Sequence, residues 1–180
     1  MFDVRVWAPL AATVEVDVAE GDRTHLERRD GEWVGTVPVM SRYRVHVDGG
    51  PGLVDPLATK VWFGERHERR APDAWAVAAP WPRAQPQRWT TRPLVVAEAH
   101  ARGLTMGLDL PDAGTFTAAA SDLGRLASLG VSVLELLPIH QFDPAEGNYW
   151  GYMPLVFGAV HGHYGSAEDM AAFVAAAHEH

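Results

Sequence analysis

The sequence contains no cysteine, which excludes disulfide bridges and cysteine-based zinc sites. Basic residues are few: 15 Lys and Arg stand against 23 Asp and Glu, and the formal net charge is −8. Because phosphate binding needs a basic face, this balance argues against a nucleic-acid partner. No apolar run approaches the roughly 20 residues that cross a bilayer, and the first residues do not resemble a secretory signal. We therefore expect a cytoplasmic protein without a membrane partner.

The chain is rich in apolar residues and in tryptophan. Its apolar fraction of 47% is sufficient for a packed core, and seven residues are Trp. Trp rings pack in cores, and they also provide flat surfaces on which sugar rings stack. An acidic chain with this composition fits a neutral ligand, such as a sugar polymer, better than a polyanion.

Residues 1–50 alternate between apolar and polar side chains. Val14, Val16 and Val18 share one face of a predicted strand, and similar runs cover residues 2–6, 32–37 and 43–47. Turn residues separate these runs. Short strands of period two with regular turns predict a small antiparallel β-sandwich.

Residues 51–93 lose this periodicity, because proline recurs through the stretch and interrupts helices and strands. The prolines are Pro51, Pro56, Pro72, Pro80, Pro82, Pro86 and Pro93. A run of charged residues at 65–70 has the composition of a solvated linker. We interpret residues 51–93 as a proline-rich connector between two domains.

Residues 94–180 show a different pattern, in which strands and helices alternate. Apolar strands are predicted at 94–97 and 131–137, and amphipathic helices at 115–129 and 167–180. Thr115 and Ser166 stand at the predicted helix N-caps. Strands that are apolar on both faces indicate a parallel sheet covered by helices. No further strand follows the last helix, so we expect the sheet to be incomplete and the chain to be an N-terminal fragment.

Three short motifs follow one another along the chain. Residues 3–9 are Asp-Val-Arg-Val-Trp-Ala-Pro, residues 98–105 are Glu-Ala-His-Ala-Arg-Gly-Leu-Thr, and residues 148–152 are Asn-Tyr-Trp-Gly-Tyr. In this order they resemble the isoamylase-type glycogen debranching enzymes of the α-amylase superfamily (glycoside hydrolase family 13). The first motif resembles the opening strand of that family's carbohydrate-binding sandwich, the second resembles the end of its first barrel strand, and the third is the most specific match. This form favours the debranching group over branching enzymes and trehalose-releasing relatives.

The resemblance implies a multidomain fold: an N-terminal, early-set immunoglobulin-like sandwich at 1–50, the connector at 51–93, and the first units of an incomplete TIM (β/α)8 barrel at 94–180. It implies retaining hydrolysis of α-1,6 branch linkages in glycogen by two carboxyls about 5–5.5 Å apart. The family's catalytic motifs are expected beyond residue 180, so no catalytic residue is assigned and the chain alone is predicted to be inactive. A branching-type glycosyltransferase and a non-catalytic glucan-binding protein are the alternatives.

Four residues are candidates for binding an α-glucan. The resemblance implies that Tyr152 stacks against the sugar whose bond is cut, with Trp150 and Tyr149 bracing its loop. His100 ends a predicted barrel strand on the same side.

No cofactor and no metal are expected. The pairs His161/His163 and His178/His180 lack the spacing of a helical zinc site. Glu98 and Glu135 lie within apolar strands, where we expect buried, hydrogen-bonded carboxylates with structural roles.

Overall fold

A computed structural model describes residues 1–63, 74–80, 82, 93–143 and 150–180. The chain divides into two compact units. The first unit comprises Met1–Pro80, Gln141–Asn148 and Met153–Ala159. The second unit comprises Trp81–His140, Tyr149–Tyr152 and Val160–His180.

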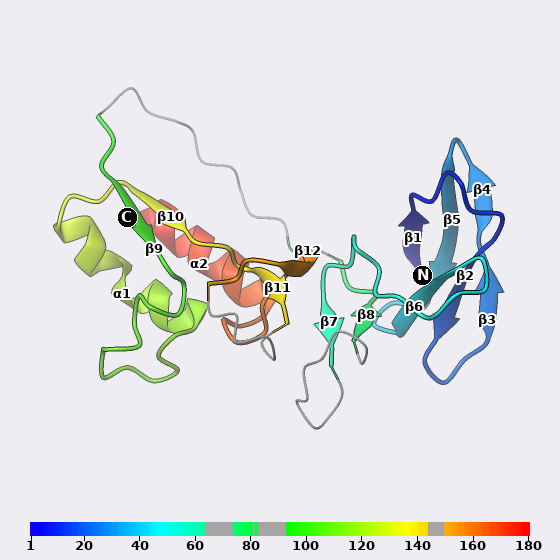
Figure 1. The fold of residues 1–180 in the computed structure, drawn as a ribbon. Helices are drawn as coiled ribbons and strands as arrows, with labels where there is room; N and C mark the ends of the chain where they lie inside the picture. Colours follow the sequence, from blue (N-terminus) through cyan, green and yellow to red (C-terminus); the bar gives the residue numbers. More distant parts are fainter. Residues whose placement is uncertain (64–73, 81, 83–92, 144–149) are drawn as a thin grey trace. The chain divides into compact units, whose positions relative to one another are not determined.

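The first unit contains two antiparallel sheets (Figure 1). One sheet has the order β1-β5-β4, with strands at Phe2–Val6, Glu32–Val37 and Glu27–Arg29. The other has the order β3-β2-β6-β8-β7, with strands at Arg23–His25, Val14–Val18, Arg42–Val47, Trp75–Val77 and Val61–Trp62.

The two sheets of the first unit enclose a single apolar core. Val4 from one sheet and Val16 and Tyr43 from the other are at most 1% exposed and belong to the same cluster. Asp3, the neighbour of Val4 in β1, points outward because successive side chains of a strand alternate between its faces. The N-terminal β domain predicted from the alternation is therefore present.

Strands β7 and β8 lie within the proline-rich stretch that was predicted to be a connector. β8 joins the sheet beside β6, with Tyr43 opposite Ala76, and β7 pairs with β8 through Val61 and Ala76. Strands of two or three residues are too short to show a period, so their pairing depends on a partner distant in sequence. The charged run at 65–70 lies outside the described residues.

Strands β11 (His140–Phe142) and β12 (Pro154–Val160) form a separate two-stranded sheet. Val156 and Ala159 of β12 are buried in the core of the first unit. Gly158 fits there closely, because a Cβ at this position would lie 2.8 Å from the carbonyl oxygen of Ala58. A segment from late in the sequence thus completes the packing of the first unit.

The second unit contains a parallel pair of strands, β9 (Val96–Ala99) and β10 (Val133–Leu136). The backbone bond from Leu137 N–H to the Ala99 carbonyl continues the pair at the carboxyl ends of the strands. The parallel arrangement predicted from the apolar runs is confirmed.

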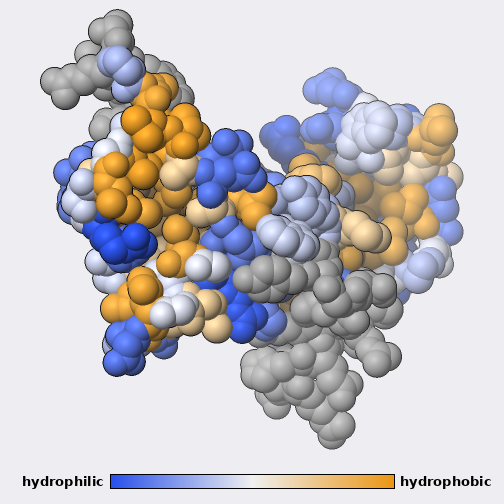
Figure 2. Space-filling view, turned by 60° about the vertical axis from the view of Figure 1, so that its left-hand side comes forward, coloured by the Kyte–Doolittle hydropathy of each residue, from blue (hydrophilic) through white to orange (hydrophobic). Residues whose placement is uncertain are grey.

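The prediction that both faces of this pair are buried, however, is wrong for three residues. Val96, Glu98 and Glu135 are exposed, and the two glutamates are neighbours in the register. Within the described residues this sheet has only these two strands, so part of its surface meets solvent. Figure 2 shows apolar side chains gathered on this unit, and Leu94, Val95 and Val96 are among the exposed apolar residues.

Helices α1 (Phe116–Ser128) and α2 (Ala167–Glu179) begin where the sequence predicted. The Thr115 hydroxyl accepts a hydrogen bond from the Ala118 N–H, and Ser166 and Asp169 form a reciprocal capping box. The helices pack together through Phe116 and Phe173, whose ring centroids are 5.9 Å apart. Among the described residues, neither helix has the length and apolarity to span a bilayer.

Candidate functional site

The candidate site in the second unit is built on a glycine that lies against the end of strand β10. Gly151 has φ +80°, and a Cβ at this position would overlap the carbonyl oxygen of Pro138, two residues beyond β10. Only glycine fits both the conformation and the contact. The backbone of the predicted Trp150-Gly151-Tyr152 motif is therefore held at the carboxyl end of a parallel strand, where ligands of α/β folds usually bind.

The two aromatic residues beside Gly151 are open to solvent. Trp150 is 56% exposed and Tyr152 is 57% exposed. Large aromatic side chains usually lose most of their exposed surface on folding, and two that remain exposed provide flat apolar faces. The structure therefore places two of the predicted binding residues together in an accessible position.

His100 lies directly after β9 and meets the same loop. Its ring is perpendicular to the Trp150 ring, with centroids 6.1 Å apart. Its Nδ1 accepts a hydrogen bond from the Gly103 N–H at 3.1 Å, and its Nε2 is 3.2 Å from the hydroxyl oxygen of Tyr164. The structure thus brings His100 and Trp150 together at the ends of two neighbouring strands. Tyr149 lies outside the described residues.

Tyr164 was not singled out by the sequence analysis, although it anchors this arrangement. It is 2% exposed, and its ring contacts those of His100, Phe116 and His161. Its carbonyl accepts from the N–H of Phe116, the first residue of α1. An aromatic residue between His163 and Gly165, shortly before a capped helix, was the signal available in the sequence.

The histidine pair His161 and His163 does form a contact, with Nε2 of the first 3.2 Å from Nδ1 of the second. His161 is fully buried. In the described part of the chain, however, no group of three or more potential metal ligands converges.

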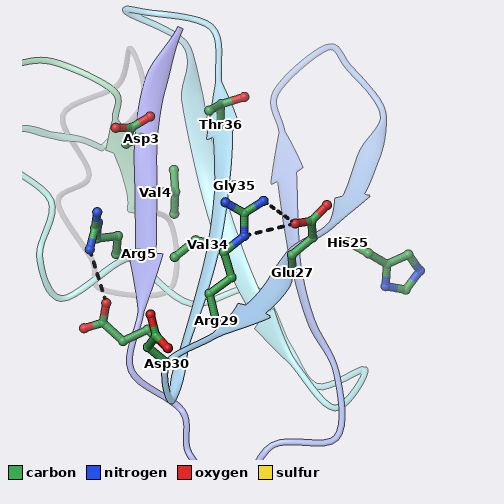
Figure 3. Close-up of a pocket in the computed structure, with 11 residues that line it drawn as sticks. Asp3, Val4, Arg5, His25, Glu27, Arg29, Asp30, Val34, Gly35 and Thr36 are labelled. Atoms are coloured by element: carbon green, nitrogen blue, oxygen red, sulfur yellow. Dashed lines mark hydrogen bonds and ion pairs between the residues drawn. The ribbon is translucent and has the colours of Figure 1, made fainter.

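The first unit has a hollow on the outer face of the β1-β5-β4 sheet (Figure 3). It has a volume of about 430 Å³. The lining residues are Asp3, Val4, Arg5, His25, Glu27, Arg29, Asp30, Glu32, Val34, Gly35 and Thr36, a set without Trp, Tyr or Phe. Its arginines are paired with carboxylates, Arg29 with Glu27 at 2.5 Å and Arg5 with Glu32 at 3.5 Å. This hollow has the character of a solvated, charged strand face.

The partly buried tryptophans at the other edge of the first unit are covered by arginine. The Arg42 guanidinium lies 4.2 Å from the centroid of the Trp62 ring, and that of Arg44 lies 4.3 Å from the Trp75 ring. Each contact occupies one face of an indole that could otherwise stack on a sugar. Trp150 and Tyr152 are therefore better candidates for a stacking platform.

The chain is similar over almost its whole length to curated carbohydrate enzymes. It is 32% identical over 183 residues to a malto-oligosyltrehalose trehalohydrolase of Mycobacterium tuberculosis, covering 99% of this chain and 30% of that protein. It is 38% identical over 169 residues to a glycogen debranching enzyme of Klebsiella pneumoniae, covering 72% of this chain and 26% of that protein. The chain thus spans about a third or less of the length of these relatives. No protein-family profile matches it.

Solved structures share the fold. A putative α-amylase from Salmonella typhimurium matches with a TM-score of 0.72 and 26% identity, covering 98% of this chain and 29% of the other. The pullulanase SAP of Group B Streptococcus in complex with maltotetraose matches with a TM-score of 0.76 and 19% identity, covering 98% and 30%.

Proposed function

Because this chain belongs to the α-amylase superfamily, with debranching-type enzymes among its homologues, we propose that it serves in the hydrolysis of α-1,6 branch linkages in glycogen or related α-glucans. Its own contribution is the loop that carries Trp150 and Tyr152. The single observation that carries this proposal is the pair of exposed aromatic rings held by Gly151 at the end of a parallel strand.

In this proposal β9, α1, β10 and α2 are the first two strand–helix units of a (β/α)8 barrel. The parallel register of β9 and β10 supports it, because a parallel sheet requires helical crossovers such as α1. In such barrels the substrate lies at the carboxyl ends of the strands. His100, Pro138 and Gly151 mark that side in the second unit.

The stacking role of Tyr152 follows from the chemistry of glucose rings. The axial C–H groups of a pyranose ring meet the electron-rich face of an aromatic ring, an arrangement that an exposed Tyr on a fixed loop can offer. Trp150 provides a second such face two residues away. An α-glucan is therefore the proposed partner of this loop.

The motifs of the nucleophile and the general acid/base are not matched within the 180 residues. We expect the purified chain to release no reducing sugar from glycogen, because retaining hydrolysis needs both carboxyls across the bond. Incubation with glycogen and a reducing-end assay tests this expectation, and measurable release would contradict it.

A second candidate, release of trehalose from a malto-oligosyltrehalose, is favoured by the relatives that carry that name and match 99% of this chain. NMR signals of the Trp150 indole and the Tyr152 ring distinguish the two. An α-1,6-branched limit dextrin is expected to shift these signals at lower concentration than a malto-oligosyltrehalose of equal length. The reverse order would favour the second candidate, and no shift with either ligand would contradict both.

A further inference from the structure

The tautomer of His100 follows from its hydrogen bonds. The backbone N–H of Gly103 can only donate, so Nδ1 of His100 must accept and carries no proton in the neutral ring. The proton of the neutral ring is therefore on Nε2, which donates to the hydroxyl oxygen of Tyr164. Both ring nitrogens are thus used within the protein, and neither is directed to a ligand.

The partner of Nε2 is fixed in place. Tyr164 is 2% exposed, its N–H donates to the carbonyl of His161, and its own carbonyl accepts from Phe116. The centroid of the Phe116 ring lies 6.0 Å from that of Tyr164 and 5.9 Å from that of Phe173. This chain of rings connects the packed helices α1 and α2 to the imidazole at the end of β9.

The exposed member of this chain of rings is Trp150. Its indole is 56% exposed, yet it meets the imidazole of His100 edge to face. A perpendicular ring contact of this kind contributes about 0.5–1.5 kcal/mol beyond area burial in general. It also restricts the rotamers of the exposed ring.

We propose that His100 is a positioning residue, which fixes the orientation of the Trp150 ring and does not contact the substrate itself. The hydrogen bond from His100 to Tyr164 holds the imidazole in place for this contact. The inference about substrate rests on the proposed function, in which Trp150 faces an α-glucan. The inference that His100 orients the Trp150 ring in the free protein does not depend on the proposed function. A fixed platform binds more tightly because less side-chain entropy is lost on binding.

The test uses the Tyr164→Phe and His100→Ala variants of the whole 180-residue chain. The steady-state heteronuclear NOE of the Trp150 indole N–H reports ring mobility, and a Trp150→Phe variant assigns the signal. Two other indoles serve as internal references. Trp33, whose Nε1–H donates to Ala8, is the rigid reference, and Trp7, at 74% exposure, is the mobile one.

In the unchanged protein we expect the heteronuclear NOE of the Trp150 indole to lie near that of Trp33. In both variants we expect this NOE to fall toward that of Trp7. Long-range proton–nitrogen spectra should show His100 protonated on Nε2. The His100→Gln variant, which can place an amide nitrogen near the position of Nε2 but lacks the ring that meets Trp150, should leave the Trp150 indole mobile. The opposite tautomer, or an unchanged Trp150 value in both variants, would overturn the proposal.

Titration with maltoheptaose separates this inference from the proposed function. We expect Kd to rise about 2- to 10-fold in Tyr164→Phe, the loss that corresponds to one aromatic contact. If maltoheptaose does not bind the unchanged protein, the proposed function fails while the NOE result still decides the positioning role. If it binds equally to both proteins although the ring is mobile, positioning of Trp150 for the glucan is refuted.

Discussion

Tyr43 and Asp55 form a buried polar pair inside the first unit. The Tyr43 hydroxyl donates to the Asp55 carboxylate at 2.7 Å, and the Leu57 N–H donates to its other oxygen at 2.9 Å. Tyr43 is fully buried and Asp55 is 3% exposed. Burial raises the pKa of the Asp55 carboxyl, while the hydrogen bonds from Tyr43 and Leu57 oppose the rise. Burial and the neighbouring Asp55 raise the pKa of Tyr43, so its hydroxyl remains a donor.

Removal of this hydroxyl should destabilise the first unit. In Tyr43→Phe the buried carboxylate loses one of its donors, which lowers the free energy of unfolding by about 1.5–3 kcal/mol, as for hydrogen bonds to charged groups. Urea unfolding followed by amide signals of β6 measures the loss. Thr36→Val, on the exposed face of β5, is the matched control and should change the free energy by less than about 0.5 kcal/mol. Equal effects in the two variants would contradict a role for the pair.

The raised pKa of Asp55 predicts how stability depends on pH. Its folded pKa exceeds the ordinary value of 3.8. The folded state therefore binds the proton more tightly than the unfolded state, and this contribution is fully present below the ordinary pKa and lost as pH rises through the folded one. Asn cannot titrate, so the stability of Asp55→Asn relative to the unchanged protein should increase with pH across that window.

Urea midpoints measured at a series of pH values test this dependence. Asp3→Asn, which removes a carboxylate from the exposed face of the same unit, corrects for the general effect of one negative charge. A relative stability of Asp55→Asn that falls as pH rises would show that the sign of the shift is wrong.

At the scale of elements, local signals in the sequence were sufficient where one segment determines its own structure. The alternating valines of β2 and the N-cap residues Thr115 and Ser166 each act within a few residues, and the structure confirms them. β7 and β8 were missed because β8 depends on pairing with β6, and β7 depends on pairing with β8. The anchoring of Gly151 on Pro138 likewise depends on a contact that sequence periodicity does not encode.

The N-cap of α1 allows a matched test. Thr115→Ala removes the side chain that accepts from Ala118, and should lower local stability by about 1 kcal/mol. Thr117→Ala makes the same chemical change at an exposed position within the first turn, where Ala is the better helix former. Hydrogen exchange of amides within α1 should therefore accelerate in the first variant only. Acceleration in both, or in neither, would contradict the assigned cap.

Packing of β12 in the first unit makes a second prediction for an element. Gly158→Ala would bring a Cβ to 2.8 Å from the Ala58 carbonyl, so β12 must shift. Overpacking of this kind typically costs about 1–3 kcal/mol. In contrast, a Cβ at Gly107 would meet no atom within 4 Å, and Gly107→Ala is the control. Thermal unfolding that is unchanged in Gly158→Ala would contradict the close fit.

At the scale of the whole molecule, the chain combines an N-terminal β domain with a second unit that carries the candidate site. Of the four predicted binding residues, the structure brings His100 and Trp150 into contact and exposes Tyr152, while Tyr149 is not described. The aromatic motif itself was visible in the sequence. The role of Tyr164 was not, because its contacts join segments 64 residues apart.

The most direct measurement of the central claim is binding of maltoheptaose to the 180-residue protein and to its Tyr152→Ala variant. We predict binding that perturbs the NMR signals of Trp150 and Tyr152, and a loss of affinity of about tenfold or more in the variant, as for removal of a stacking aromatic ring. Phe157→Ala, which removes another aromatic side chain exposed by 69%, should retain the affinity of the unchanged protein. Equal binding by all three proteins, or no binding by the unchanged one, would contradict the claim that this loop is a glucan-binding site.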